Sequence, residues 1–167
     1  MSSHGIYSKV SEPGAAPSPG VPPRPRTWLV GENNPYYPYR IGCSGARLCT
    51  FLGLTEDEYL ERFERRNLLS QEKWSVPLAR RAAAFLVSQI SDGDRLVLLG
   101  AQVTQAFRYE FELLKIWEAR DQLPGREIHY RVLIAPHPSS MSRIWNDPAM
   151  PARLRAALAE LEGRAAA

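Results

Sequence analysis

The stretch VPLARRAAAFLVSQISDGDRLVLLG, residues 76–100, decides the fold class. Its first part, residues 76–90, predicts a helix, because a proline stands in the first turn and the turn-forming SDGD follows the segment. The run RLVLLG at residues 95–100 is almost entirely apolar, as in a strand that is buried on both faces. A helix that leads into such a strand is typical of a parallel sheet with helices packed on it.

The same alternation extends in both directions along the chain. Upstream, Thr55 and Glu58 form a capping-box pattern, which places the start of another helix there. We therefore expect an α/β protein with three α/β/α layers and a mostly parallel central sheet. In such a sheet, ligands bind at the carboxyl ends of the strands. Strands are predicted at residues 27–30, 95–100 and 127–135, a short strand or loop at 67–69, and helices at 44–54, 55–66, 76–90, 101–119 and 148–162.

Composition limits the domain organisation and the compartment. Residues 1–26 are rich in proline, glycine, serine and alanine, so we expect a disordered arm, followed by a single domain at residues 27–167. No apolar run is long enough to span a membrane and no signal-peptide pattern opens the sequence, so we expect a cytoplasmic protein. The net charge of +3 is too small to identify a nucleic-acid binder by itself. We expect a monomer.

Two polar segments follow the first and the last predicted strand. GENNPYYPY, residues 31–39, follows the first strand, and APHPSSMSR, residues 135–143, follows the last. Because parallel strands end at the same edge of a sheet, the two segments are expected to line one cleft. They bring a histidine, serines, an arginine, a carboxylate and amides to that edge.

Together, the two segments resemble the first and second motifs of the uracil-DNA glycosylase superfamily. The resemblance covers most of the chain after the arm, with RRNLL (65–69) where the family keeps a base-reading asparagine and LVLLGAQV (96–103) as its central strand. It implies the fold of that superfamily and a monofunctional DNA glycosylase. Such an enzyme hydrolyses the N-glycosidic bond of a flipped-out uracil or modified pyrimidine and leaves an abasic site. The implied partner is single- or double-stranded DNA.

The resemblance also implies the catalytic residues. Bond cleavage develops positive charge at the sugar and negative charge at the leaving base, so the site needs a group that positions water and a hydrogen-bond donor. His137 would donate to an oxygen of the leaving base. Asn34 or Glu32 would position the water, and the choice stays open because the first motif has one residue more than the usual spacing.

Base recognition is implied for three side chains. Asn67 would face the edge of the base, since one amide offers both a donor and an acceptor. Tyr36 would close the pocket near C5 of the pyrimidine, and Phe51 or a neighbouring aromatic would stack on the base. The alternatives are structural: Asn67 is equally suited to end the preceding helix, and Asn34 to form a turn.

The second motif is also expected to contact the DNA backbone. Serine hydroxyls and backbone N–H groups hold phosphates, and an apolar side chain fills the gap that a flipped nucleotide leaves. Met141 takes the position of that apolar side chain, where relatives carry leucine. Trp145 is expected to pack in the core rather than to stack on a ligand. The residues expected at the DNA are Ser139, Ser140, Met141, Ser142 and Arg143.

We expect neither a metal nor a cofactor. Some relatives hold a [4Fe-4S] cluster through four thiolates, whereas this chain has only Cys43 and Cys49. The two cysteines form no C-x-x-C or zinc pattern. Both are expected to be small, buried, apolar side chains.

The alternative to an enzyme is a catalytically inactive DNA- or nucleotide-binding module of the same fold. A relative that acts on a free nucleotide is also compatible with the first motif, whereas a serine hydrolase is disfavoured because no G-x-S-x-G turn is present. The base is a second open question. Departures from the common pattern at Met141, Tyr36, Tyr37 and Tyr39 surround the expected pocket. They leave either uracil or a damaged or enlarged pyrimidine as the substrate. A hypermodified phage base would imply antiphage defence instead of DNA repair.

Overall fold

A five-stranded sheet organises the chain in the computed structural model, which describes residues 24–33, 44–70, 73–139 and 141–164. The strand order is β2-β1-β3-β5-β4. The first four of these pair in parallel, and only β4, at one edge, runs antiparallel to its neighbour. The expected mostly parallel sheet of an α/β protein is confirmed. The strands are β1 (Thr27–Gly31), β2 (Phe63–Asn67), β3 (Arg95–Leu99), β4 (Ile116–Leu123) and β5 (Arg126–Ala135).

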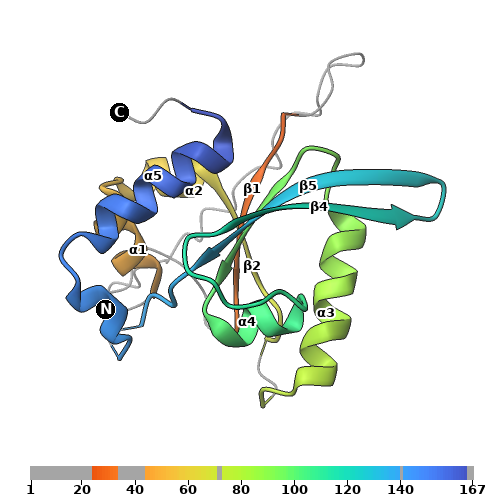
Figure 1. Cartoon of the computed structure of the whole chain (residues 1–167), viewed down its shortest axis with the longest axis horizontal. Coiled ribbons are helices and arrows are strands. Elements are labelled where there is room, and N and C mark those ends of the chain that lie inside the picture. Colours follow the sequence, from red (N-terminus) through yellow and green to blue (C-terminus); the bar gives the residue numbers. More distant parts are fainter. Residues whose placement is uncertain (1–23, 34–43, 71–72, 140, 165–167) are drawn as a thin grey trace, which may run out of the picture.

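Helices cover both faces of this sheet (Figure 1). One buried cluster joins α3 and α4 to one face, and a second joins α1, α2 and α5 to the other. The side chains of β3 point alternately to the two faces of the sheet: Leu96 and Leu98 belong to the first cluster, and Val97 and Leu99 belong to the second. An apolar run without alternation is therefore required in the middle of the three layers. The helices are α1 (Ser44–Leu52), α2 (Glu56–Arg62), α3 (Val76–Gln89), α4 (Ala101–Ala106) and α5 (Met150–Glu162).

The helix predicted at residues 101–119 is wrong beyond its first turns. Helix α4 ends at Ala106, and the later part of the segment forms strand β4. Two residues between them, Arg108 and Leu114, have positive φ values of 63° and 62°, which a continuous helix does not allow. Trp117 and Ala119 pack against the first cluster, and β4 pairs with β5 along its whole length. Tertiary pairing thus overrides a segment of helical composition.

The helix predicted at residues 55–66 ends earlier than expected. Its start is confirmed, because Thr55 and Glu58 form the capping box in both directions. Helix α2 stops at Arg62, however, and the chain continues directly into β2, which pairs in register with β1. Phe63 is buried at this junction with its ring edge-on to Tyr59. The predicted strand or loop at 67–69 therefore lies at the end of β2 and in the loop after it.

The last predicted helix also begins later than expected. Helix α5 starts at Met150 rather than at Pro148, and a single 3₁₀ turn, η1 (Arg143–Asn146), precedes it. In the described part of the chain, no helix is long and apolar enough to cross a bilayer.

Asp94 fixes the entry of the chain into β1. This carboxylate is fully buried and accepts hydrogen bonds from the backbone N–H of Arg26 (2.7 Å), the indole Nε1 of Trp28 (3.0 Å) and the backbone N–H of Ser91 (3.0 Å). The guanidinium of Arg26 also lies over the Trp28 ring, 4.6 Å from its centroid. The last residue of the predicted arm is therefore held against the domain, and residues 1–23 lie outside the described range.

Candidate functional site

Three of the predicted site residues lie at one edge of the sheet, where the parallel strands end. Glu32 follows β1, Asn67 is the last residue of β2, and His137 comes two residues after the end of β5. Between them, Gly100 follows β3. This edge is at the lower end of the sheet in Figure 1. It is the place where a parallel α/β sheet binds its ligands.

The loop after β2 lies directly against the end of β1. Asn67 is paired in register with Gly31, and the backbone N–H groups of Leu68 and Leu69 donate to the carbonyls of Gly31 (2.9 Å) and Glu32 (3.0 Å). The side-chain oxygen of Asn67 is buried and accepts no hydrogen bond in the described part of the chain. Such an acceptor costs free energy unless a ligand supplies the donor. Asn67 ends strand β2, so it does not end the preceding helix, and its role in base recognition stays a prediction.

His137 is packed against the backbone of Gly100. A Cβ atom added at Gly100 would lie 3.0 Å from Cβ and 3.3 Å from Cδ2 of His137. Gly100 also has a φ of +98°, a conformation that side chains disfavour. The peptide N–H of Gly100 donates to the carbonyl of Ala135 (2.9 Å), so the ends of β3 and β5 are joined below the imidazole. Sequence reasoning missed Gly100, although a glycine between a strand and a helix is a signal of close approach.

The hydrogen bonds of His137 define its tautomer. The backbone N–H of Ser139 donates to Nδ1 of the imidazole at 3.1 Å, so Nδ1 is an acceptor and the proton of the neutral ring is on Nε2. Burial lowers the pKa of His137 below 6.5, and the nearby carboxylate of Glu32 opposes this shift more weakly. The site therefore holds a histidine with a lowered pKa, whose neutral ring has its N–H donor on Nε2 and whose pKa is affected by the charge of Glu32.

Trp145 connects the histidine loop to helix α1. Its indole Nε1 donates to the backbone carbonyl of His137 at 2.8 Å. Its ring is stacked on Phe51, with centroids 3.9 Å apart and an interplanar angle of 13°. Arg155 of α5 donates to the carbonyl of Phe51 at 2.7 Å, which fixes this end of α1. One face of the Phe51 ring is thus covered by Trp145, and Trp145 holds the loop of His137 in addition to packing.

The second motif presents its remaining side chains beside this histidine. Ser139 and Ser142 are half-buried, and the N–H of Ser142 donates to the carbonyl of Ser139 (3.2 Å), which makes the loop compact. Met141 is 90% exposed, and Arg143 is exposed at the start of η1. One apolar side chain, Met141, and one cationic side chain, Arg143, are therefore exposed beside the site, where a partner can contact them.

Several predicted residues lie outside the described residues. These are Asn34, Tyr36 and Ser140, together with the tyrosines at 37 and 39 and Cys43. Of the two candidates for positioning the water, only Glu32 lies in the described part of the chain, so the choice between Glu32 and Asn34 stays open. Within the described ranges, no group of three or more His, Cys, Asp or Glu side chains could hold a metal ion, and Cys49 is a buried free thiol.

No protein-family model matches the sequence, and no curated protein matches it at the significance required.

The buried imidazole makes stability depend on pH. Because the pKa of His137 is below 6.5 in the folded protein, the unfolded chain binds this proton more readily. The free energy of unfolding that depends on a neutral His137 is fully present above pH 6.5. It is lost as the pH falls from 6.5 through the lower pKa of His137 in the folded protein. We expect the wild type to lose more unfolding free energy than His137→Asn over this interval, as measured by urea denaturation at several pH values. If the free energies of unfolding of the wild type and of His137→Asn change equally with pH, this prediction is wrong.

Proposed function

We propose that the chain is a DNA glycosylase of the uracil-DNA glycosylase superfamily, which hydrolyses the N-glycosidic bond of a flipped-out uracil or modified pyrimidine. The observation that carries this proposal is that Glu32 and His137, from two motifs far apart in the sequence, follow parallel strands at the same edge of the sheet, where the Glu32 carboxylate acts to raise the pKa of His137. The two residues provide opposite halves of the chemistry. A carboxylate favours positive charge at the sugar, and an N–H donor favours negative charge on the leaving base.

His137 stabilises the leaving base. Its neutral imidazole donates from Nε2, and the acceptance of the Ser139 N–H at Nδ1 keeps the ring in the required tautomer. A low pKa serves this role, since the ring remains neutral at physiological pH and donates a hydrogen bond without losing its proton. As the C1′–N1 bond breaks, its electron pair moves to the base, and the hydrogen bond to the base oxygen becomes stronger.

Glu32 acts at the sugar side of the breaking bond. Its charge stabilises the oxocarbenium-like sugar, and it orients the water that adds to C1′ and gives up a proton. Asn34 is the alternative for the second task. The buried, unpaired side-chain oxygen of Asn67 favours a ligand with an N–H donor on its edge, as a pyrimidine with a ring N–H or an exocyclic amine has.

The test of this proposal is the release of free base from DNA. The protein is incubated with DNA that contains uracil, and in parallel with phage genomic DNA that contains hypermodified pyrimidines. Released base is measured by mass spectrometry, and abasic sites are revealed by alkali. Release from one substrate supports the glycosylase and separates a repair role from a defence role. If the protein binds these DNAs but releases no base, the inactive binding module replaces the glycosylase.

Trp145→Phe should separate the positioning of His137 from simple packing. Phenylalanine keeps a stacked ring on Phe51 but loses the hydrogen bond to the His137 carbonyl. A neutral hydrogen bond contributes about 1 kcal/mol, so we expect the single-turnover rate to fall about fivefold with DNA affinity unchanged. The matched control is Trp117→Phe, since the indole nitrogen of Trp117 is buried without a hydrogen-bond partner. Equal rates for the two variants would show that the hydrogen bond from Trp145 does not position His137.

Arg143→Ala should reduce the salt dependence of DNA binding. One lost phosphate contact lowers the slope of log affinity against log salt by about one unit, without a change in base preference. The measurement is fluorescence anisotropy over a range of salt concentrations. Arg80→Ala on the exposed side of α3 is the control for the change in net charge. A slope equal to that of this control would show that Arg143 does not contact the backbone.

A further inference from the structure

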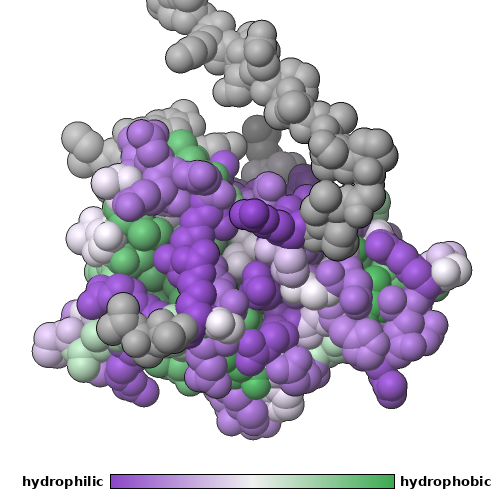
Figure 2. Space-filling model, turned by 90° about the horizontal axis from the view of Figure 1, so that it is seen from above, coloured by the Kyte–Doolittle hydropathy of each residue, from purple (hydrophilic) through white to green (hydrophobic). Residues whose placement is uncertain are grey.

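A cavity of about 730 Å³ lies at the end of the sheet opposite to the candidate active site. It is formed where the chain enters β1, at the junction of α2 and β2, at the start of β3 and at the end of α5. Figure 2 looks onto this end of the molecule and shows hydrophilic residues across the middle of the face. The size is in the range of small-molecule sites. All cations in its lining are arginines, namely Arg24, Arg26, Arg62, Arg65, Arg95 and Arg164.

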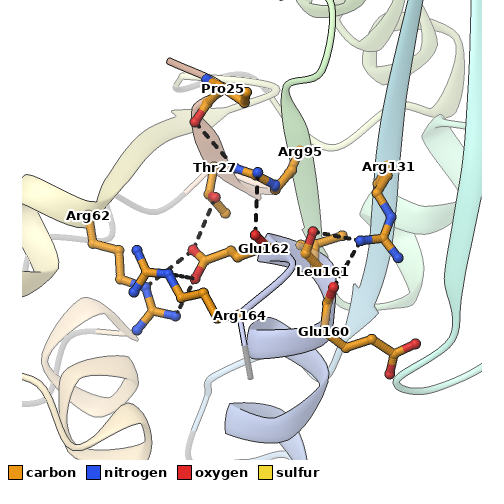
Figure 3. Close-up of polar contacts among 9 residues, drawn as sticks. All are labelled: Pro25, Thr27, Arg62, Arg95, Arg131, Glu160, Leu161, Glu162 and Arg164. Carbon is orange, nitrogen blue, oxygen red and sulfur yellow. Dashed lines mark hydrogen bonds and ion pairs between the residues drawn. The ribbon is translucent and has the colours of Figure 1, made fainter. Parts of the chain in front are cut away.

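Two of these arginines, Arg62 and Arg164, pair with a single buried carboxylate, that of Glu162, which is 4% exposed (Figure 3). Nη2 of Arg62 and Nε of Arg164 lie 2.7 Å and 3.3 Å from the same oxygen of this carboxylate. The hydroxyl of Thr27 donates to its other oxygen at 3.2 Å. Arg95 contributes positive charge but donates to backbone carbonyls, those of Pro25 (3.2 Å) and Glu162 (3.5 Å). Two guanidinium groups thus share one negative charge, and the third, that of Arg95, is held by backbone carbonyls.

The remaining acidic side chains do not remove this excess. Glu58 caps its own helix through Thr55, and Glu61 and Glu64 are exposed to solvent. Six arginines and four glutamates line the cavity, and Arg26 is also paired with the buried carboxylate of Asp94 at 3.5 Å, which leaves an excess of one positive charge. The Arg62 and Arg164 side chains are 22% and 64% exposed, so the cavity presents guanidinium groups that a ligand can reach.

We propose that this cavity binds an anion that carries phosphate groups. A guanidinium presents two parallel N–H donors, which match two oxygens of a phosphate, and several guanidinium groups from different segments distribute the charge. Arg164 and Arg24, at the rim, make the first contacts, and Arg95 lies behind them at the start of β3. Phosphate of a free ester and phosphate of a nucleic-acid backbone provide the same chemistry.

The cavity is separate from the proposed glycosylase site. It lies at the amino ends of strands of which the other ends carry Glu32, Asn67 and His137. Five residues of strand span about 16 Å, so one phosphate cannot contact both sites. Binding here therefore does not depend on the proposed function.

The test compares two probes, inorganic pyrophosphate and a short single-stranded oligo-dT, on the full chain. Amide and guanidinium resonances are followed by NMR, with pyrophosphate added to about 10 mM, tenfold above a Kd of about 1 mM. We expect shifts at Thr27, Arg95 and Arg164 and none at His137 with pyrophosphate. The variant Arg24→Gln/Arg164→Gln should raise the Kd at least tenfold, because charge-assisted hydrogen bonds are lost. The control, Arg80→Gln/Arg81→Gln, makes the same charge change on α3.

The results distinguish the phosphate sources. Shifts with pyrophosphate support a free phosphate ester, and shifts at these residues with oligo-dT alone support a nucleic-acid backbone. The absence of shifts at this end with both probes overturns the proposal, as does an equal Kd for the two double variants. If the protein releases no base but shows these shifts, the proposed glycosylase activity is wrong and the proposed phosphate site is supported.

Discussion

His137→Ala lowers the single-turnover rate of base release by about 100- to 1000-fold, if His137 donates to the leaving base. Removal of one donor to a developing oxyanion typically costs about 3 to 4 kcal/mol. The contact becomes strong only in the transition state, so affinity for DNA with an abasic site should stay within about threefold of the wild type. The measurement is single-turnover cleavage on a substrate that the wild type accepts, with abasic sites revealed by alkali.

A matched control comes from His129, which has a 65% exposed side chain in β5. His129→Ala should cleave at the rate of the wild type. If His137→Ala also cleaves within about threefold of the wild type, this loop does not carry glycosylase chemistry. The inactive DNA- or nucleotide-binding module is then the better explanation of the site.

Asp94→Ala has the largest expected effect on stability. The substitution leaves three donors without their acceptor, and the indole Nε1 of Trp28 is completely buried. It also removes the carboxylate partner of Arg26. Each buried unsatisfied group costs about 1 to 3 kcal/mol, so the free energy of unfolding should fall by about 3 to 4 kcal/mol. Urea denaturation measures this as a lower midpoint with an unchanged slope.

The control for this variant is Asp92→Ala. Asp92 lies in the same turn but is exposed, and it accepts the backbone N–H of His129 at 2.7 Å. Its removal should cost less than about 1 kcal/mol. A similar loss in both variants would show that the turn, and not the buried network of Asp94, determines the stability.

The layers of the fold could be predicted because burial is visible in the sequence. β3 must be apolar from Leu96 to Leu99 to contact helices on both faces, and the helix before it has a proline in its first turn. β4 could not be predicted in this way. Its alternation of Trp117, Ala119, Asp121 and Leu123 is weak, and its structure depends on pairing with β5, a partner that follows it in the sequence.

The candidate site was predictable in part for a similar reason. Glu32 and His137 follow strands, so the parallel topology alone brings them to one edge. The tautomer of His137 and the hydrogen bond from Trp145 depend on the path of the loop, which local sequence does not determine. The stacking of Phe51 on Trp145 is likewise a contact between separate elements. The guanidinium of Arg47 also lies over the Phe51 ring, 5.4 Å from its centroid, and the expected stacking of Phe51 on a base stays a prediction.

Gly100 has a consequence for how this protein can evolve. Its φ is positive and an added Cβ would lie 3.0 Å from Cβ of His137, so a side chain at this position is strained and displaces His137 by a few tenths of an ångström. The two positions are therefore constrained as a pair. A lineage that retains the histidine is expected to retain the glycine, whereas loss of the histidine removes the steric contact but leaves the backbone strain of a non-glycine residue. In a set of homologues, glycine at this position without the histidine would identify chains that kept the fold after losing the donor.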